Sequence, residues 1–147
     1  MRFTRKLALL FALAALSAAA VKAQSADEHF NNGLARAEGG DFAAAISEMD
    51  KAIARRGNFA DAYRARAHFK LLTNDLDGAL ADLSRAAELD PRGASVHFTR
   101  GQIMLETGRE KEAQKDFARS LELDPTMKPL VDSTLAGHQR ERESKRP

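Results

Sequence analysis

The residues that could do chemistry in this sequence are four histidines and many carboxylates, because the chain has no cysteine. The histidines are His29, His68, His97 and His138. No two of them lie four residues apart with a glutamate between them, which is the spacing of a metalloprotease helix. The phosphate loop G-x-x-x-x-G-K-[ST] and the nucleophile turn G-x-S-x-G are also missing from the sequence. We therefore expect a protein that is not an enzyme, with no catalytic residue, no metal site and no cofactor.

The elements that would position these side chains repeat every 34 residues. Small residues recur at this interval in three series, which are Gly33, Ala67 and Gly101; Ala45, Ala79 and Ala113; and Ala52, Ala86 and Ser120. Residues 60–93 and 94–127 align without a gap and share 11 identical positions. Such a period is typical of repeat proteins. The pattern predicts two helices in each unit, which approach closely where the small residues lie.

Turn-forming residues divide the units into these helices. The predicted turns inside the units are Gly39-Gly40-Asp41, Asn74-Asp75 and Thr107-Gly108. Proline blocks helix continuation at Asp90-Pro91 and Asp124-Pro125, and Gly57 serves as the stop of the first unit. A bulkier 34-residue series, Met49, Leu83 and Phe117, is expected to fill the space beside each helix crossing.

This pattern resembles the tetratricopeptide repeat family. The family has small residues at repeat positions 8 and 27, alanine at 20, a bulky residue at 24 and proline at 32. Residues 94–127 match with Gly101, Ala113, Phe117, Ser120 and Pro125. Residues 26–59 and 60–93 match as well, except that Gly57 stands in place of the first proline. The resemblance implies an all-α fold: a right-handed superhelical α-solenoid of three helix-turn-helix repeats within a domain over residues 24–140.

The family also implies where a partner would bind. Its first helices line a concave groove, into which repeat positions 5 and 9 face. In this sequence these positions are Phe30, Leu34, Arg64, His68, Phe98 and Gln102. They describe a groove that is apolar at both ends and cationic in the middle. The alternative is that Phe30 and Phe98 belong partly to the core and that the groove is unused.

Some family members hold a C-terminal carboxylate with basic and asparagine side chains. The corresponding residues here are Phe30, Leu34, Ala65, Ser95 and Thr99. None of them carries the required charge or amide, so the sequence argues against such a clamp.

Two arginines have candidate partners inside their own repeats. Arg66 and Arg100 each precede an aspartate by 16 residues, namely Asp82 and Asp116. We expect paired salt bridges between the two helices of each unit. The alternative is a set of surface charges, each pair of which contributes less than about 1 kcal/mol.

The end of the stack needs a cap, because the last unit has no neighbour. A capping helix is predicted over about residues 128–140, with Leu130, Val131 and Leu135 on its apolar stripe. Residues 141–147 form a polar basic tail. It is either a solvated end or a contact for anionic lipid or wall polymer.

The first 23 residues have the layout of a secretory signal peptide. Arg2, Arg5 and Lys6 precede an apolar run over residues 7–21, and small residues lie before a cleavage point near Ala23. This run is shorter than the roughly 20 residues that span a bilayer. We expect an exported protein, periplasmic or secreted, with no membrane span in the mature chain. An uncleaved signal anchor is the alternative.

Charge argues against nucleic acid as a partner. The chain has a formal net charge of +2, from 23 basic and 21 acidic residues. Four of the basic residues lie in the predicted signal peptide, so the remainder is slightly negative. A basic footprint, which nucleic-acid binding requires, is therefore lacking.

The function that the sequence favours is a non-catalytic adaptor or scaffold, which binds a protein or peptide in the groove. A self-associating structural protein of the cell envelope, and so a homo-oligomer, is the alternative. A third possibility, a binder of small molecules or wall fragments, needs an enclosed polar pocket that the sequence does not indicate.

Overall fold

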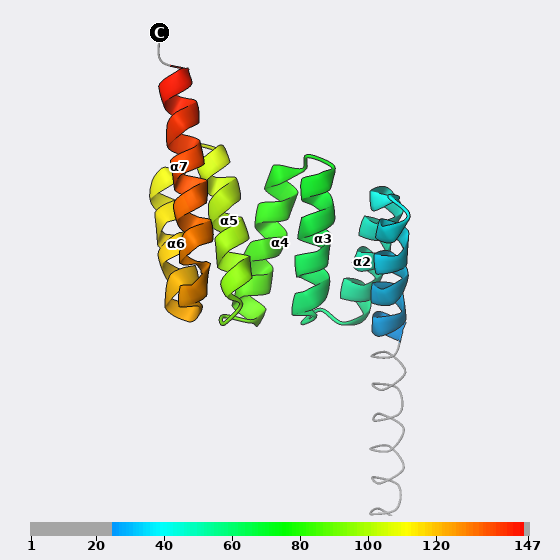
Figure 1. The fold of residues 1–147 in the computed structure, drawn as a ribbon. Helices are drawn as coiled ribbons and strands as arrows, with labels where there is room; N and C mark the ends of the chain where they lie inside the picture. Colours follow the sequence, from blue (N-terminus) through cyan, green and yellow to red (C-terminus); the bar gives the residue numbers. More distant parts are fainter. Residues whose placement is uncertain (1–24, 146–147) are drawn as a thin grey trace, which may run out of the picture.

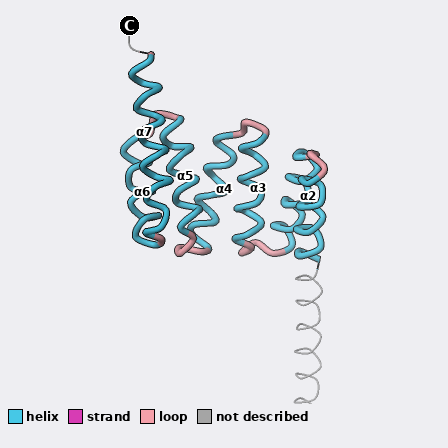
Figure 2. The backbone as a smooth tube through the Cα atoms, in the orientation of Figure 1, coloured by secondary structure: helices cyan, strands magenta, loops and turns pink. Residues whose placement is uncertain are grey.

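The computed structural model describes residues 25–145, and all regular structure in this range is helical. The first helix covers residues 25–38. It is followed by α2 (Phe42–Arg55), α3 (Ala60–Leu72), α4 (Leu76–Leu89), α5 (Ala94–Glu106), α6 (Glu110–Leu123), the 3-10 turn η1 (Pro125–Met127) and α7 (Lys128–Ser144). The helices stand side by side in a row of pairs (Figure 1), and the connections lie only at the two ends of the helices (Figure 2). This arrangement confirms the predicted all-α solenoid. The predicted signal peptide lies outside the described residues.

The 34-residue series mark the places where the two helices of a pair meet. Ala45, Ala79 and Ala113 are completely buried. The bulky series beside them is buried too, with Met49 at 0 %, and Leu83 and Phe117 at 2 %, exposed. A β-carbon added at Gly101 would lie 2.9 Å from Cε1 of Phe117. The third repeat thus places a glycine opposite the ring of a phenylalanine, because the helix axes are too close for both positions to carry large side chains.

Turn chemistry repeats with the same period. Gly40, Asn74 and Gly108 have positive φ angles of 79°, 62° and 77°, and they end the first helix of each pair. Left-handed backbone of this kind favours glycine, and asparagine tolerates it best among the other residues. Asp41 and Asp75 then cap the next helices, since each accepts a hydrogen bond from the amide three residues later.

The predicted ion pairs are confirmed, and both are bidentate. Arg66 donates from Nε and Nη2 to Asp82, at 2.8 and 2.5 Å, and Arg100 donates likewise to Asp116, at 2.6 and 2.7 Å. The aspartates are buried, with 3 % and 6 % exposed. Hydrogen bonds to Asp82 raise the pKa of Arg66 above its ordinary value. These pairs are therefore buried salt bridges between the two helices of a repeat rather than surface charges.

Two histidines also contact carboxylates between the paired helices, and the sequence did not predict these contacts. His97 Nδ1 lies 3.4 Å from Asp116 Oδ1. In the first repeat, where Asn32 replaces the arginine, His29 Nδ1 lies 2.7 Å from Glu48 Oε2. Each repeat thus has a carboxylate on its second helix that a basic side chain of the first helix holds.

The capping helix α7 is longer than expected. Val131 is its buried anchor, at 3 % exposed. The helix continues to Ser144, past the predicted end near residue 140, so part of the expected tail is helical. The added turns lie beside α6: Arg142 forms an ion pair with Glu110, and His138 Nε2 lies 3.7 Å from the same carboxylate. Within residues 25–145, no helix is both long and apolar enough to cross a membrane.

Candidate functional site

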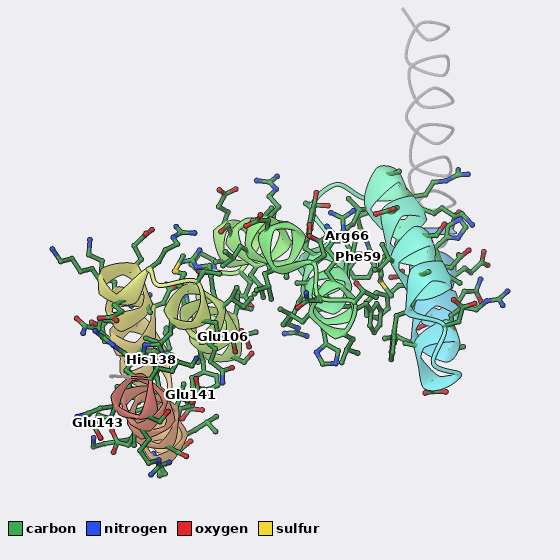
Figure 3. All side chains as sticks on the ribbon, turned by 90° about the horizontal axis from the view of Figure 1, so that it is seen from above. Phe59, Arg66, Glu106, His138, Glu141 and Glu143 are labelled. Carbon is green, nitrogen blue, oxygen red and sulfur yellow. The ribbon has the colours of Figure 1, made fainter. Side chains whose placement is uncertain are left out.

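A hollow of about 350 Å³ opens where three first helices of the pairs come together. Its lining side chains come from helix 25–38, α3 and α5, with Leu83 of α4 at its floor. Viewed from above, the row of helix pairs is curved, and α3, α5 and α7 follow one side of it (Figure 3). The hollow therefore belongs to the face that the first helices form. Its volume lies at the small end of the range for ligand pockets, about 300–1,000 Å³.

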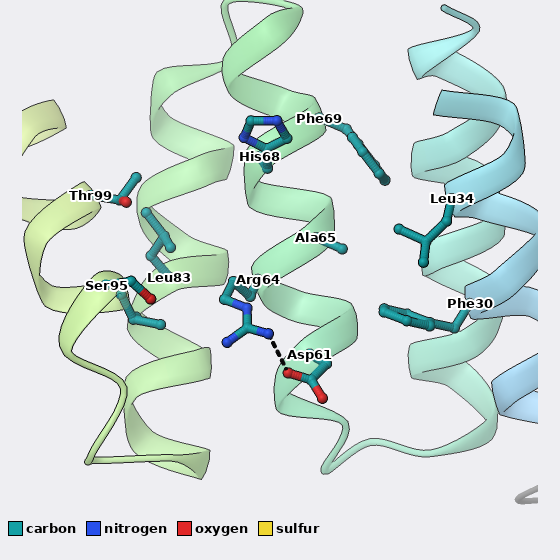
Figure 4. A pocket seen from close by; sticks show the side chains of 11 residues that line it. Phe30, Leu34, Asp61, Arg64, Ala65, His68, Phe69, Leu83, Ser95 and Thr99 are labelled. Carbon is teal, nitrogen blue, oxygen red and sulfur yellow. Dashed lines mark hydrogen bonds and ion pairs between the residues drawn. The ribbon is translucent and has the colours of Figure 1, made fainter. Parts of the chain in front are cut away.

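The walls of the hollow are mainly apolar. Phe30 and Leu34 face Ala65 and Phe69 across it (Figure 4). Leu34 is 37 % exposed, which is unusual for a large apolar side chain in this molecule. An apolar side chain of a partner would thus meet apolar atoms on two sides and remove them from water.

Neighbouring residues hold Phe30 in place. Its ring centroid lies 5.0 Å from that of Phe59, which precedes α3. The guanidinium of Arg56 lies over the ring of Phe59, 3.6 Å from its centroid. Arg56 also forms an ion pair with Asp27. Stacked rings and cations of this kind stabilise each other. One wall of the hollow is therefore built before a ligand arrives.

Polar groups lie on the opposite side. Arg64 donates to Asp61 at 2.7 Å, and both side chains are more than half exposed. His68 is exposed, and Ser95 and Thr99 add hydroxyl groups from α5. Because Asp61 balances Arg64, this side offers hydrogen-bond donors and acceptors without a strong net charge.

The six groove residues expected from the sequence do not all come together. Phe30, Leu34, Arg64 and His68 line the hollow. Phe98 does not, because its side chain is only 6 % exposed and its ring packs 5.8 Å from that of Phe117. Gln102 lies farther along the same face, in the next two hollows. The site therefore has one aromatic anchor position instead of two.

No cluster of three or more histidine, aspartate or glutamate side chains within residues 25–145 has a geometry that could hold a metal ion. The hollow instead includes all five positions at which the family places its carboxylate clamp: Phe30, Leu34, Ala65, Ser95 and Thr99. Apolar atoms and hydroxyl groups occupy them here.

Comparison with known proteins agrees with this architecture. Residues 94–127 match the family model described as "Tetratricopeptide repeat". A search of curated protein sequences gave no significant match. The solved structures that are similar include the Arabidopsis OM64 TPR domain, with a TM-score of 0.74, 23% identity, and coverage of 82% of this chain and 98% of that one.

Two further similar structures are TPR domains with a bound peptide. The second TPR of Spaghetti (RPAP3), bound to the HSP90 peptide SRMEEVD, has a TM-score of 0.69 and 27% identity, and the match covers 74% of this chain and 99% of that one. The first TPR of the same protein, bound to the same peptide, has a TM-score of 0.74 and 21% identity, over 82% and 95% of the two chains. The described part of this chain thus has the fold of a tetratricopeptide solenoid, and residues 94–127 also match the tetratricopeptide repeat model by sequence.

Proposed function

We propose that this protein is an exported, non-catalytic interaction module, an adaptor or scaffold that binds a peptide segment of a protein partner in its concave face. The observation that carries the proposal is the hollow beside Leu34 and Phe30, in which large apolar side chains remain accessible. A structure 27% identical to this chain, the second TPR of Spaghetti, is bound to a peptide, which supports the same use of the fold.

The partner that fits this hollow carries an apolar anchor. Full burial of one leucine or phenylalanine side chain contributes about 1.5–3 kcal/mol. Two or three such contacts, less the cost of association, correspond to a dissociation constant on the order of micromolar. A peptide held mainly by its C-terminal carboxylate is a poorer fit, because Ala65 and Ser95 stand where a clamp needs basic or amide side chains.

A pull-down from cell-envelope extract tests this proposal through one exposed leucine. The Leu34→Asp variant is expected to recover the bound partner at least about tenfold less than the native chain, because a carboxylate would be desolvated against apolar walls. Leu72→Asp is the matched control, since Leu72 is 51 % exposed and lies outside the hollow. Recovery of the same proteins in equal amounts by all three chains would rule out the groove as the binding site.

Export is the part of the proposal that rests on residues 1–23. Its support is the charge and apolar pattern of that segment. The mass of the chain recovered from the periplasm of an expression host is expected to correspond to a protein that begins at Gln24. An intact chain in the cytoplasmic fraction would contradict this.

Self-association remains the second candidate, and the exposed end of the stack favours it. Leu130 lies on α7, the terminal helix, and its side chain is 50 % exposed. A second copy of the chain could pack against it there. Sedimentation equilibrium at high protein concentration distinguishes the two functions. A monomer supports the adaptor, whereas a dimer that Leu130→Ser dissociates supports self-association.

A further inference from the structure

The hollow at Phe30 is not isolated, because two more hollows continue it along the concave face. The second lies between α3, α4 and α5, and it shares Thr99 with the first. The third lies between α5 and α7, and it shares Gln102 and Glu106 with the second. The three therefore form one continuous groove that runs from helix 25–38 to the capping helix.

The chemistry of this groove changes along its length. The first hollow is mainly apolar, and its one cation, Arg64, is balanced by Asp61. The third hollow is lined by Glu106 of α5 and Glu141 of α7, which lie toward the same side of the molecule (Figure 3). Among the described residues, 25–145, neither glutamate takes part in an ion pair. The far end of the groove thus presents two carboxylates that form no ion pair with a described side chain.

His138 is a basic group at this end, but its side chain lies near another carboxylate. It lines the third hollow, and its Nε2 lies 3.7 Å from Glu110 of α6. Arg142, one turn later, also pairs with Glu110. Both of these basic side chains therefore lie beside Glu110 of α6, and no ion pair within residues 25–145 includes Glu106 or Glu141.

We infer that the peptide bound in this groove carries a lysine or arginine that lies against Glu106 and Glu141, in addition to the apolar anchor in the first hollow. The inference rests on the proposed peptide-binding function and adds the chemical class of the partner. Neighbouring helices pack about 8–10 Å apart, so the first and third hollows are separated by about two such steps. An extended chain rises about 3.3 Å per residue. The basic residue should therefore lie about five positions from the anchor.

Four fluorescein-labelled peptides of equal length test this inference by fluorescence anisotropy. Each has the same Leu-Phe anchor. Two carry lysine five positions after or five positions before the anchor, since the groove can accept either chain direction, and the other two carry glutamine or glutamate at the position of the better lysine. One lysine peptide is expected to bind about fivefold more tightly than the glutamine peptide, and the glutamate peptide more weakly. Raising the salt concentration should reduce this advantage, because exposed charges are screened.

Variants of the protein assign the effect to the two glutamates. In Glu106→Gln/Glu141→Gln, the lysine advantage should disappear while the affinity for the glutamine peptide is unchanged. Glu88→Gln/Glu122→Gln is the matched control on the outer helices α4 and α6, and it should keep the advantage. Equal binding of the lysine and glutamine peptides would overturn the inference and leave the proposed function intact. Failure of all four peptides to bind the native chain would overturn both.

Discussion

Replacing Asp82 with alanine is expected to lower the free energy of unfolding by about 2–3 kcal/mol. Asp82 holds two cations at once: Arg66 through two hydrogen bonds, and Lys70, whose Nζ lies 2.8 Å away. Removing one partner of a buried ion pair costs about 3–5 kcal/mol, because the remaining charge stays desolvated. Here the loss is smaller, since Arg66 also bonds Asp50 and both cations keep some access to water.

Thermal unfolding measures this loss directly. For a domain of this size, the expected decrease corresponds to a fall in Tm of about 10 °C. Glu88→Ala is the matched control in the same helix, because Glu88 is exposed and, within residues 25–145, forms an ion pair with Arg85 alone. That variant should change the stability by less than about 1 kcal/mol. If Asp82→Ala melts within about 2 °C of the native protein, the buried salt bridges do not stabilise the folded domain.

The second large effect is expected at Gly101, where the two helices of the third repeat leave no room for a side chain. Gly101→Val should destabilise the protein by about 3 kcal/mol, near the upper end of the range for overpacked cores. Its β-carbon alone would lie 2.9 Å from Phe117 Cε1 and 3.3 Å from the Ala113 carbonyl oxygen. The buried ring and the backbone of α6 leave little room to move.

Another helical glycine supplies the control for this substitution. Apart from its own helix backbone and chain neighbours, a β-carbon at Gly137 in α7 would meet no atom of the described residues within 4 Å, so Gly137→Val should leave the stability unchanged or slightly raised. Adding Phe117→Leu to Gly101→Val should recover about half of the loss, because it recreates the smaller partner seen in the second repeat, where Ala67 faces Leu83. Chemical denaturation of the single and double variants gives the coupling energy. Equal effects at Gly101 and Gly137 would contradict the close crossing.

The fold could be predicted from sequence because its constraints recur every 34 residues. The left-handed turns at Gly40, Asn74 and Gly108 and the buried Met49, Leu83 and Phe117 all follow this period. The pairs Arg66–Asp82 and Arg100–Asp116 could be predicted for the same reason, since the same arginine-to-aspartate spacing of 16 residues occurs in both repeats.

The groove could be predicted only in part. Its position follows from the repeat, but the direction of a side chain does not. Phe98 turns toward Phe117 and becomes buried, because removing an aromatic ring from water lowers the free energy. Arg64, at the equivalent position of the second repeat, stays exposed beside Asp61. Glu141 escaped notice because α7 has no counterpart in the repeats. The contact of Arg142 with Glu110, near the end of α7, joins residues 32 apart and follows no repeated spacing.

Site-specific photo-crosslinking tests the central claim, which is that a partner binds the concave face. Benzoylphenylalanine would be introduced at Leu34, inside the hollow, and separately at Leu72, an exposed leucine outside it. After irradiation in envelope extract, the account predicts a discrete crosslinked product from position 34 and none from position 72. Equal products from both positions, or a product from position 72 alone, would contradict it.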